Sequence, residues 1–531
     1  MTETELAALC AAITPPDEAA RAAAHAHWAS LAKPLGGLGG LETTIEDAAA
    51  LTGSAKLDIS RRAVLVLCAD NGVVAQGVSQ TDSSVTRAVA ENLAARRTSV
   101  CRMAQTARCE VVPVDMGIAG EPVPGVLDCR IAPGTADFTL GPAMSREQAV
   151  EAIGRGIRLV QEQKKAGVGL LATGEMGIGN TTTSSAVAAV LLGQPVEVMT
   201  GRGAGLSDEG LARKIDAIHR GIAKNQPDSA DALDVLAKLG GFDIAGLCGV
   251  FLGGALEGVP VLADGFISCV AALCAVRFCP AAAKAVFASH CSTEPAAKLV
   301  LDALNKKAII TAGLHLGEGT GAVAAIPLWD MALAVYDGCY SFEEGGIEAY
   351  TPQGGCEMLT LVLGGAASGK SACAESLVLK TGLPRYYLAT MQVWDAECAA
   401  RVEKHRKMRA QKQFETLECP LHLDRLSLPG RGTVLLEDLG NLVANELYSP
   451  GGAGKHTAEA VLAGLERLAA GCGELIVVSN EVFSGGADYA GDTDQYLLAL
   501  AQVNNAFAAR ADNVCRVVCG LPVYYKGGEK L

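Results

Sequence analysis

Residues 358–380, MLTLVLGGAASGKSACAESLVLK, decide the fold of the C-terminal part of the chain. An apolar strand leads into a glycine-rich turn and a helical pattern follows, which is the context that the phosphate-binding motif G-x-x-x-x-G-K-[ST] requires. Lys370 is placed to reach the β- and γ-phosphate oxygens of a nucleotide, and Ser371 to hold Mg²⁺. The alternative is a glycine-rich turn that matches the motif by chance. The strand before the turn and the helical pattern after it make this alternative less favoured. The predicted nucleotide loop is Gly364, Gly365, Ala366, Ala367, Ser368, Gly369, Lys370 and Ser371.

A second strand of this region, TVLLEDLGN (433–441), ends in two acidic residues, Glu437 and Asp438. One interpretation is an acidic strand end that helps to position Mg²⁺. The other is the start of a phosphoribosyl-pyrophosphate loop, which should continue with small hydroxyl residues. Gly440 and Asn441 follow instead, so we reject the second interpretation.

The basic segment RVEKHRKMRAQK (401–412) surrounds His405 with cations. Such a run usually forms a solvated helix face, and the segment alone favours that interpretation. Nearby cations also disfavour the imidazolium form, so His405 could stay neutral and act as a nucleophile. The same cations would attract a triphosphate.

The rest of the chain alternates apolar strand patterns with longer Ala-rich helical patterns. Strands are expected within RAVLVLCAD (62–70), CEVVPVDMGI (109–118), VGLLATGEMGIGNT (168–181) and KAIITAGLHLGEGTG (307–321). This alternation predicts an α/β fold of two domains. We expect a Rossmann-like parallel sheet with extra helices at the N-terminus and a P-loop NTPase-like parallel sheet at the C-terminus. The aperiodic, Gly- and acid-rich segment 340–357 reads as a linker, which gives domains over residues 1–350 and 357–531.

Three glycine-rich turns of the first domain are candidate ligand loops, because ligands of parallel sheets bind at the carboxyl ends of the strands. They are GEMGIGNTTTSS (174–185), TGRGAGLS (200–207) and GEGTGA (317–322). Each turn alone is best explained as an ordinary connection, but together they favour a phosphate site. Glu318, between two glycines, could approach a ligand closely and act as a base if partly desolvated.

Composition limits the partners. The chain has 531 residues, 50% of them apolar, and a net charge of −14, which argues against duplex nucleic acid or an anionic membrane as the main partner. The start, MTETELAALC, has no basic segment typical of a signal peptide, and the apolar stretch 244–276 is interrupted by Glu257 and Asp264. We expect a cytoplasmic protein that is not membrane-embedded.

The 18 cysteines include no C-x-x-C pair and are best interpreted as reduced thiols.

Residues 358–531 resemble the bifunctional adenosylcobinamide kinase/adenosylcobinamide-phosphate guanylyltransferase family. The strings that carry the resemblance are GGAASGKS, YLATMQVWDAECAARVEKHR, ETLECP, VLLEDLGNLVANEL and VVSNEV. The resemblance implies that Mg²⁺ with GTP or ATP binds at the loop, that Ser371 is the metal ligand, and that His405 carries GMP covalently. Ala367 departs from the arginine of many members, and Phe483 from a glycine. Further implied nucleotide contacts are Ala389, Thr390, Arg406, Lys407, Met408, Arg409, Glu418 and Glu437.

Residues 30–330 resemble nicotinate-nucleotide–dimethylbenzimidazole phosphoribosyltransferases. The matching strings, all collinear, are PLGGLGGLE, ADNGVVAQGVS, GEMGIGNTTTSSAV, TGRGAGL, GGFDIAGLCGVFLGGA, PVLADGFIS and LHLGEGTGAVAAIPL. The resemblance implies that Glu318 is the catalytic base, with Glu175 and Lys214 also at the active site and no cofactor. Asp243 and Asp264 either shape the site or cap helices. Candidate phosphoribosyl and base contacts are Ser79, Ser83, Gly177, Gly179, Asn180, Thr181, Gly201, Arg202 and Gly203; Ser83 aligns with a glutamine of many members.

The two resemblances imply a fused enzyme for the nucleotide loop of cobamides. Its expected partners are nicotinate mononucleotide, a benzimidazole-type base, adenosylcobinamide and GTP or ATP, and we expect a homo-oligomer. Two alternatives stay open: a nicotinate-salvage phosphoribosyltransferase joined to a simple NTPase, and a regulatory module that binds nucleotide without turnover.

Overall fold

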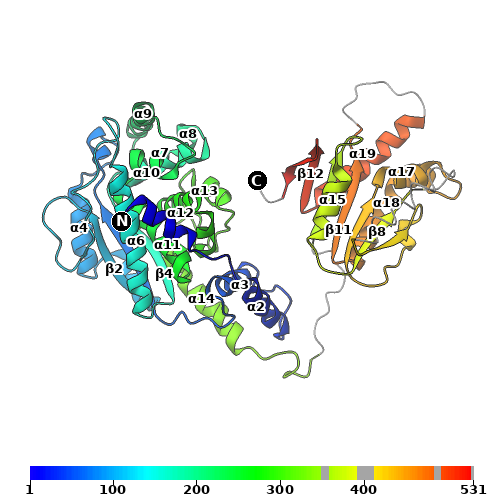
Figure 1. Ribbon diagram of the computed structural model, residues 1–531, viewed down its shortest axis with the longest axis horizontal. Coiled ribbons are helices and arrows are strands. Elements are labelled where there is room, and N and C mark those ends of the chain that lie inside the picture. Colours follow the sequence, from blue (N-terminus) through cyan, green and yellow to red (C-terminus); the bar gives the residue numbers. More distant parts are fainter. Residues whose placement is uncertain (348–357, 392–411, 483–491, 528–531) are drawn as a thin grey trace. The chain divides into compact units, whose positions relative to one another are not determined.

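The structure is a computed structural model that describes residues 1–347, 358–391, 412–482 and 492–527. Residue contacts divide the chain into two units, Met1–Ala349 and Tyr350–Leu531. Figure 1 shows that each unit has its own sheet with helices packed against it.

The sheet of the first unit has six parallel strands in the order β3-β2-β1-β4-β5-β6. This order is that of the dinucleotide-binding Rossmann fold, so the predicted fold is confirmed. In such a sheet the carboxyl ends of β1 and β4, the first strands of its two halves, lie side by side at the switch point. The strands are β1 (Arg62–Ala69), β2 (Glu110–Gly117), β3 (Leu127–Asp128), β4 (Leu170–Met176), β5 (Val261–Ala263) and β6 (Val286–Ala288).

The core of this unit forms around β1 and α11, which are buried along almost their whole length. All eight residues of β1 are buried, as expected for a central parallel strand covered on both faces. Against the sheet, α6 (Arg146–Lys165) packs on α11 (Phe242–Glu257) with the backbones in contact. A Cβ added to Gly156 would lie 2.0 Å from the carbonyl oxygen of Gly246, so only glycine fits there.

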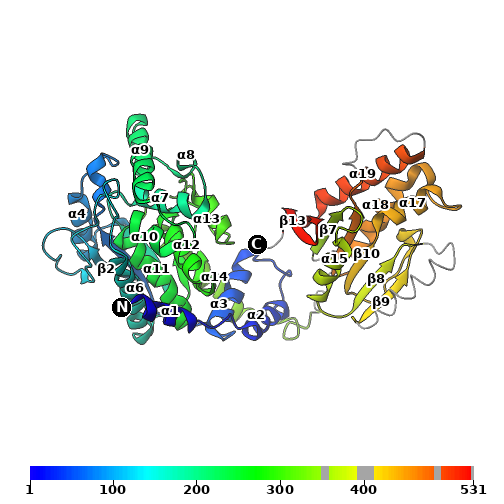
Figure 2. The same cartoon turned by 45° about the horizontal axis from the view of Figure 1, so that its top comes forward.

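Other helices surround this core. Figure 2 shows α2, α3 and α14 packed together at one end of the unit, where Trp28 and Tyr336 meet edge to face with ring centroids 4.9 Å apart. The helices are α1 (Glu3–Ala11), α2 (Glu18–Ser30), α3 (Gly40–Thr52), α4 (Ser84–Ala94), α5 (Ser99–Thr106), α7 (Asn180–Leu192), α8 (Val196–Met199), α9 (Asp208–Asn225), α10 (Ala232–Leu239), α12 (Phe266–Phe278), α13 (Ala297–Ala303) and α14 (Thr320–Gly338).

The prediction of a strand within residues 307–321 is wrong. The segment forms one isolated bridge, between Ile310 and His290, and is otherwise irregular up to the start of α14. Gly313 and Gly317 have φ angles of 69° and 88°, which an extended strand does not accommodate. The last two strands of the sheet are instead β5 and β6, each three residues long.

The second unit has a seven-stranded sheet in the order β13-β12-β7-β11-β10-β8-β9. It is parallel, as predicted, except that the edge strand β13 is antiparallel to β12. The strands are β7 (Met358–Gly364), β8 (Arg385–Ala389), β9 (Phe414–Glu418), β10 (Thr433–Glu437), β11 (Glu474–Asn480), β12 (Asn513–Val518) and β13 (Leu521–Lys526). The helices are α15 (Lys370–Leu379), α17 (Leu439–Tyr448), α18 (Thr457–Gly471) and α19 (Asp492–Arg510).

The described residues contain neither a membrane-spanning helix nor a metal-binding cluster. None of the helices described is both long enough and apolar enough to cross a membrane. In the same ranges, no three His, Cys, Asp or Glu side chains are grouped so that they could hold a metal ion.

Candidate active site

The end of β4 places the first acidic residue of the site. Glu175 is the penultimate residue of β4 and is 8% exposed. The chain then turns through Gly177 and Gly179 into α7. Gly179 has a φ of 91°, and a Cβ there would lie 2.8 Å from the Val74 side chain, so this turn requires glycine.

The loop before α14 brings Glu318 to the same place. A Cβ on Gly317 would lie 2.8 Å from Glu175 Oε1, and a Cβ on Gly174 would lie 2.5 Å from the Glu318 carbonyl oxygen. The two acidic turns are therefore in contact. Glu318 itself has a left-handed φ of 59°, and its Oε2 accepts a 3.3 Å hydrogen bond from the backbone N–H of Val100 in the first turn of α5.

Glu175 and Asp243, two of the buried acidic residues of the site, hold their protons more tightly than usual. Burial raises the pKa of Glu175 to about 8, and the negative charges of Asp243, Asp264 and Glu318 add to the rise, while a hydrogen bond from Asn180 opposes it. Burial likewise raises the pKa of Asp243 to about 6, again opposed by Asn180. Glu175 is therefore mostly protonated at neutral pH.

A lysine lies on the other side of the α7 N-terminus. Lys214, on α9, is completely buried, and its Nζ donates to Thr181 Oγ1 at 2.9 Å and to the carbonyl oxygen of Gly201 at 3.1 Å. Burial lowers the pKa of Lys214 to about 8, while the charge of Glu294 opposes the change. A cation beside a helix N-terminus is a suitable environment for a phosphate.

Many of the predicted contacts line one small cavity beside this lysine. The cavity has a volume of about 80 Å³ and is closed on one side by Val78, Gln80, Ile178, Ala204 and Leu206. Within it, Arg202 also forms an ion pair with Asp208 and donates to the Leu206 carbonyl oxygen. The predicted residues in the lining are Ser79, Gly177, Gly179, Asn180, Thr181, Arg202 and Gly203.

Three predicted contacts differ from this group. Gly201 is not part of the cavity lining, but its carbonyl oxygen accepts the hydrogen bond of Lys214. Ser83 is not part of the cavity lining; it precedes α4 and makes no capping hydrogen bond with its side chain. Asn180 lines the cavity, but its side-chain amide points toward carboxylates rather than a phosphate position: Nδ2 donates to Glu175 Oε2 and, at 2.9 Å, to Asp243 Oδ2.

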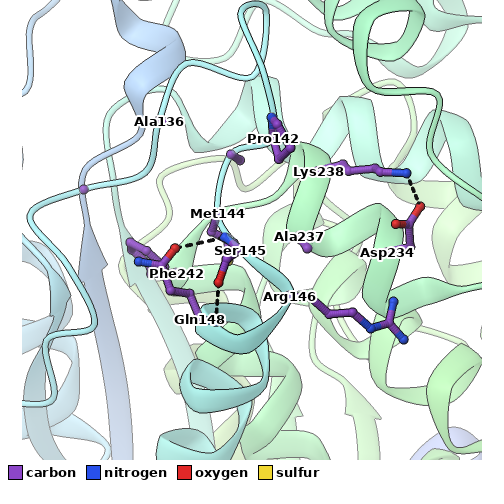
Figure 3. A pocket seen from close by; sticks show the side chains of 12 residues that line it. Ala136, Pro142, Met144, Ser145, Arg146, Gln148, Asp234, Ala237, Lys238 and Phe242 are labelled. Atoms are coloured by element: carbon purple, nitrogen blue, oxygen red, sulfur yellow. Dashed lines mark hydrogen bonds and ion pairs between the residues drawn. The ribbon is translucent and has the colours of Figure 1, made fainter. Parts of the chain in front are cut away.

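A larger cavity of about 530 Å³ lies elsewhere in the same unit, between α10 and the segment that leads into α6 (Figure 3). It contains none of the predicted site residues. Its charged and capping groups are already satisfied, since Ser145 and Gln148 form a capping box and Lys238 pairs with Asp234 at 2.8 Å. We therefore place the candidate site at the carboxyl edge of the sheet.

Two residues of the site, His290 and Val100, were not predicted from the sequence, whereas Asp264 was named there as a residue that either shapes the site or caps a helix. Asp264 holds the start of α14, because its carboxylate accepts from the backbone N–H groups of Gly319 at 3.1 Å and Ala322 at 3.0 Å. His290 lies 3.8 Å from Asp264, and burial lowers its pKa. His290 follows β6, so recognition of that short strand would have revealed it. Val100 acts through its backbone and has no signal.

The predicted phosphate loop of the second unit has the expected backbone. It joins β7 to α15, and Gly369 has a φ of 90°, with Gly520 so close that a Cβ would lie 3.0 Å from its Cα. Ala367 also adopts a left-handed φ, of 56°. Lys370 starts α15, and its Nζ donates to the Gly365 carbonyl oxygen at 3.2 Å.

The other nucleotide contacts predicted in the described residues meet at neighbouring strand ends. Ala389 pairs with Glu437 on one side and with Glu418 on the other, at the carboxyl ends of β8, β10 and β9. Thr390 follows directly, and its Oγ1 donates to the Asp438 carbonyl oxygen at 2.8 Å. Hydroxyl and carboxylate oxygens such as those of Ser371 and Glu437 are the donors that Mg²⁺ prefers, so the residues fit this ion.

The proposed guanylyl-carrying histidine cannot be placed in this way. His405 lies outside the described residues, as do Arg406, Lys407, Met408 and Arg409.

Comparison with known proteins identifies two matching families. A phosphoribosyltransferase family model matches residues 13–347. A cobinamide kinase/cobinamide phosphate guanyltransferase family model matches residues 360–525. The two matches do not overlap, and each contains one of the two sheets.

Individual relatives resemble the first unit. The nicotinate-nucleotide–dimethylbenzimidazole phosphoribosyltransferase of Acetivibrio thermocellus is 46% identical over 325 residues, which are 61% of this chain and 93% of that protein. The protein of the same name from Roseiflexus sp. is 44% identical over 339 residues, 64% of this chain and 96% of its own length. The crystal structure of CobT from Thermus thermophilus is 38% identical, with a TM-score of 0.60, and covers 62% of this chain and 100% of that one.

Proposed function

Since the chain belongs to the phosphoribosyltransferase family through its first unit and to the cobinamide kinase/guanyltransferase family through its second, we propose that it makes both halves of a cobamide nucleotide loop. Both resemblances drawn from the sequence are confirmed by these matches, and the chain is a transferase. For the first unit, the proposed reaction is phosphoribosyl transfer from nicotinate mononucleotide to a benzimidazole-type base, which yields α-ribazole 5′-phosphate.

One observation carries this assignment: the first residue of α7, Asn180, contacts Glu175 in the acidic cluster, and the next residue, Thr181, contacts Lys214. The lysine side suits the 5′-phosphate of the substrate. The acidic side suits a pyridinium ring, because a partly buried carboxylate such as Glu318 attracts a cation more strongly than it would in water. The separation of charges thus matches a ligand with a phosphate at one end and a cationic ring at the other.

The residues divide the chemistry as follows. A ring nitrogen of the base attacks C1′ of the ribose, and the bond from C1′ to the pyridinium nitrogen breaks. The bonding electrons go to the pyridine ring, so nicotinate leaves as a stable neutral ring. Glu318, whose Oε2 accepts a hydrogen bond from the Val100 backbone N–H, accepts the N–H proton of the incoming base.

For the second unit, we propose phosphorylation of adenosylcobinamide followed by guanylyl transfer from GTP through His405. The loop at Lys370 would bind the nucleotide phosphates, and Ser371 with Glu437 would hold Mg²⁺. This ion, when bound, neutralises charge on the phosphates. Ala389, Thr390, Glu418 and Glu437 at adjacent strand ends would contact the nucleotide.

Product analysis by mass spectrometry tests both assignments. The protein is incubated with nicotinate mononucleotide, a panel of benzimidazoles, adenosylcobinamide and GTP. We expect α-ribazole 5′-phosphate and adenosylcobinamide-GDP as products. Transfer to pyridine carboxylates alone, with no change in the cobinamide, would favour the nicotinate-salvage alternative. Because Ser83 replaces a glutamine of many family members, the panel should include bases other than dimethylbenzimidazole.

A further inference from the structure

We propose that Asp243 is a positioning residue whose charge keeps the Glu175 carboxyl group protonated, and that Asn180 orients both carboxyl groups, so that Glu175 serves as a hydrogen-bond donor beside the base Glu318. The inference rests on the proposed phosphoribosyl transfer. It adds to that transfer a requirement for a protonated carboxyl group next to the catalytic base.

The side-chain amide of Asn180 bridges the two buried carboxyl groups. Its Nδ2 contacts Glu175 Oε2 directly and lies 2.9 Å from Asp243 Oδ2. Asn180 is 5% exposed and Asp243 is fully buried, so both amide hydrogens are committed inside the protein. An amide in this position fixes the orientation of both carboxyl groups without adding a charge.

The surrounding backbone admits only this arrangement. A Cβ on Gly177 would lie 2.9 Å from Asp243 Oδ2, and a Cβ on Gly241 would lie 2.4 Å from Asp243 Oδ1. Asp243 is further fixed by the backbone N–H of Ile244, which donates to Oδ1 at 3.0 Å. Two glycines therefore make room for a carboxyl group that the bridge then orients.

The charges that face Glu175 come from several elements. Asp243 belongs to α11, Asp264 follows β5, and Glu318 precedes α14. The Cys68 thiol of β1 also interacts electrostatically with Glu175, and burial raises the pKa of that thiol. Asp243 in turn faces Asp70 at the end of β1. The His290 ring faces Asp264, and its lowered pKa leaves it neutral near pH 7.

Such a group of carboxyl groups cannot all be ionised in a dry environment. Burial raises the pKa of Glu175 to about 8 and the charge of Asp243 adds to the rise, so Glu175 holds its proton near neutral pH. A neutral carboxyl group can donate a hydrogen bond to the substrate, which an ionised one cannot do.

The test is the pH dependence of kcat/KM for the full-length protein, with nicotinate mononucleotide and dimethylbenzimidazole as substrates. Loss of the Glu175 proton should give an alkaline decline in wild-type activity. Asp243→Asn removes a negative charge, lowers the pKa of Glu175, and should shift the decline to lower pH by roughly one unit. Asn180→Ala removes the opposing hydrogen bond and should shift it to higher pH. General damage to the site would not produce shifts of opposite sign.

A matched pair of glutamine variants sharpens the result. Glu175→Gln keeps a donor, so it should lose less than about tenfold in kcat/KM and should lack the alkaline decline. Glu318→Gln removes a base and should lose ~10²-fold or more. If Glu175→Gln is as inactive as Glu318→Gln, or if both bridge variants shift the profile in the same direction, the proposal is wrong.

A direct measurement covers the case in which a variant does not fold. Infrared spectra of the wild-type protein at pH 7 should contain a protonated-carboxyl band that disappears reversibly as the pH rises through the decline in activity. Failure to find ribazole phosphate with the wild-type protein would contradict the proposed function. An active wild-type protein without that band would contradict only this inference.

Discussion

The two units build their candidate phosphate sites in contrasting ways. In the second unit, one turn of eight consecutive residues, Gly364 to Ser371, forms the loop between β7 and α15. In the first unit, Lys214 from α9 reaches Thr181 on α7 and Gly201 in a separate loop. The first site therefore depends on tertiary packing, whereas the backbone of a single turn supplies the second. Substitutions far along the chain from each other should couple in the first site more than in the second.

The largest effect is expected from substitution of His405, because the proposed reaction of the second unit includes a covalent intermediate and that of the first does not. His405→Ala should abolish labelling of the protein by GTP that carries label in the α-phosphate, because the attacking nitrogen is lost. Lys370→Ala should weaken the same labelling by impairing nucleotide binding. The measurement is acid-labile, base-stable label on the denatured protein. Label from the γ-phosphate would instead indicate a phosphoenzyme, and full labelling of His405→Ala would place the nucleophile elsewhere.

Glu318→Gln should lower ribazole phosphate formation by ~10²–10⁴-fold, since a general base contributes about that much. The guanylyltransferase activity of the same preparation is the internal control and should stay within about twofold of wild type. The two rates are measured side by side by product chromatography. Near-normal transfer by a folded Glu318→Gln protein would show that another group accepts the proton.

Gly156→Ala tests whether the units are stabilised separately. The new Cβ would lie 2.0 Å from the Gly246 carbonyl oxygen, so α6 and α11 must separate, at a cost of about 1–3 kcal/mol. Thermal unfolding should show a lower midpoint for the first unit and no change for the second. Gly141→Ala, where a Cβ would meet nothing within 4 Å, is the matched control. Equal shifts of both transitions would mean that the units unfold together.

The smallest effect is expected from dividing the chain. Residues 1–347 and 358–527 expressed separately should each keep their own activity within about twofold, because each contains a complete sheet and its own ligand loops. Steady-state rates of the mixed fragments are compared with those of the intact chain. An insoluble or inactive fragment would show that one unit needs the other.

The same contrast explains what the sequence could predict. Lys370 and Ser371 were predictable because a contiguous motif, a strand and a helix all coincide within 23 residues (358–380). The three glycine-rich turns were also visible, since glycine marks close backbone approach. The hydrogen bond between Asn180 and Asp243 was not predictable. The two residues are 63 positions apart, and the local sequence around each of them does not indicate its side-chain partner.

Strand length was the other obstacle. Strands of three residues, such as β5 and β6, are too short to show the alternation of a strand in the sequence. Apolar helical segments next to them in the chain make them harder still to recognise. The segment around Ile309 and Ile310 has a clearer apolar run, but glycines interrupt it and the sheet already ends at β6. The apolar residues of this segment led to the prediction of a strand, but the left-handed backbone conformation of its glycines is incompatible with one.

The two glycines that enclose the Asp243 carboxyl group have a practical consequence for protein engineering. Any side chain at Gly177 or Gly241 would overlap that carboxyl group, so a mutant library that includes these positions would contain mainly inactive clones. Ser83 is only partly buried and makes no capping bond, so it tolerates replacement without disturbing the acidic cluster. Directed evolution toward new acceptor bases should therefore diversify the start of α4 and leave the glycine frame untouched.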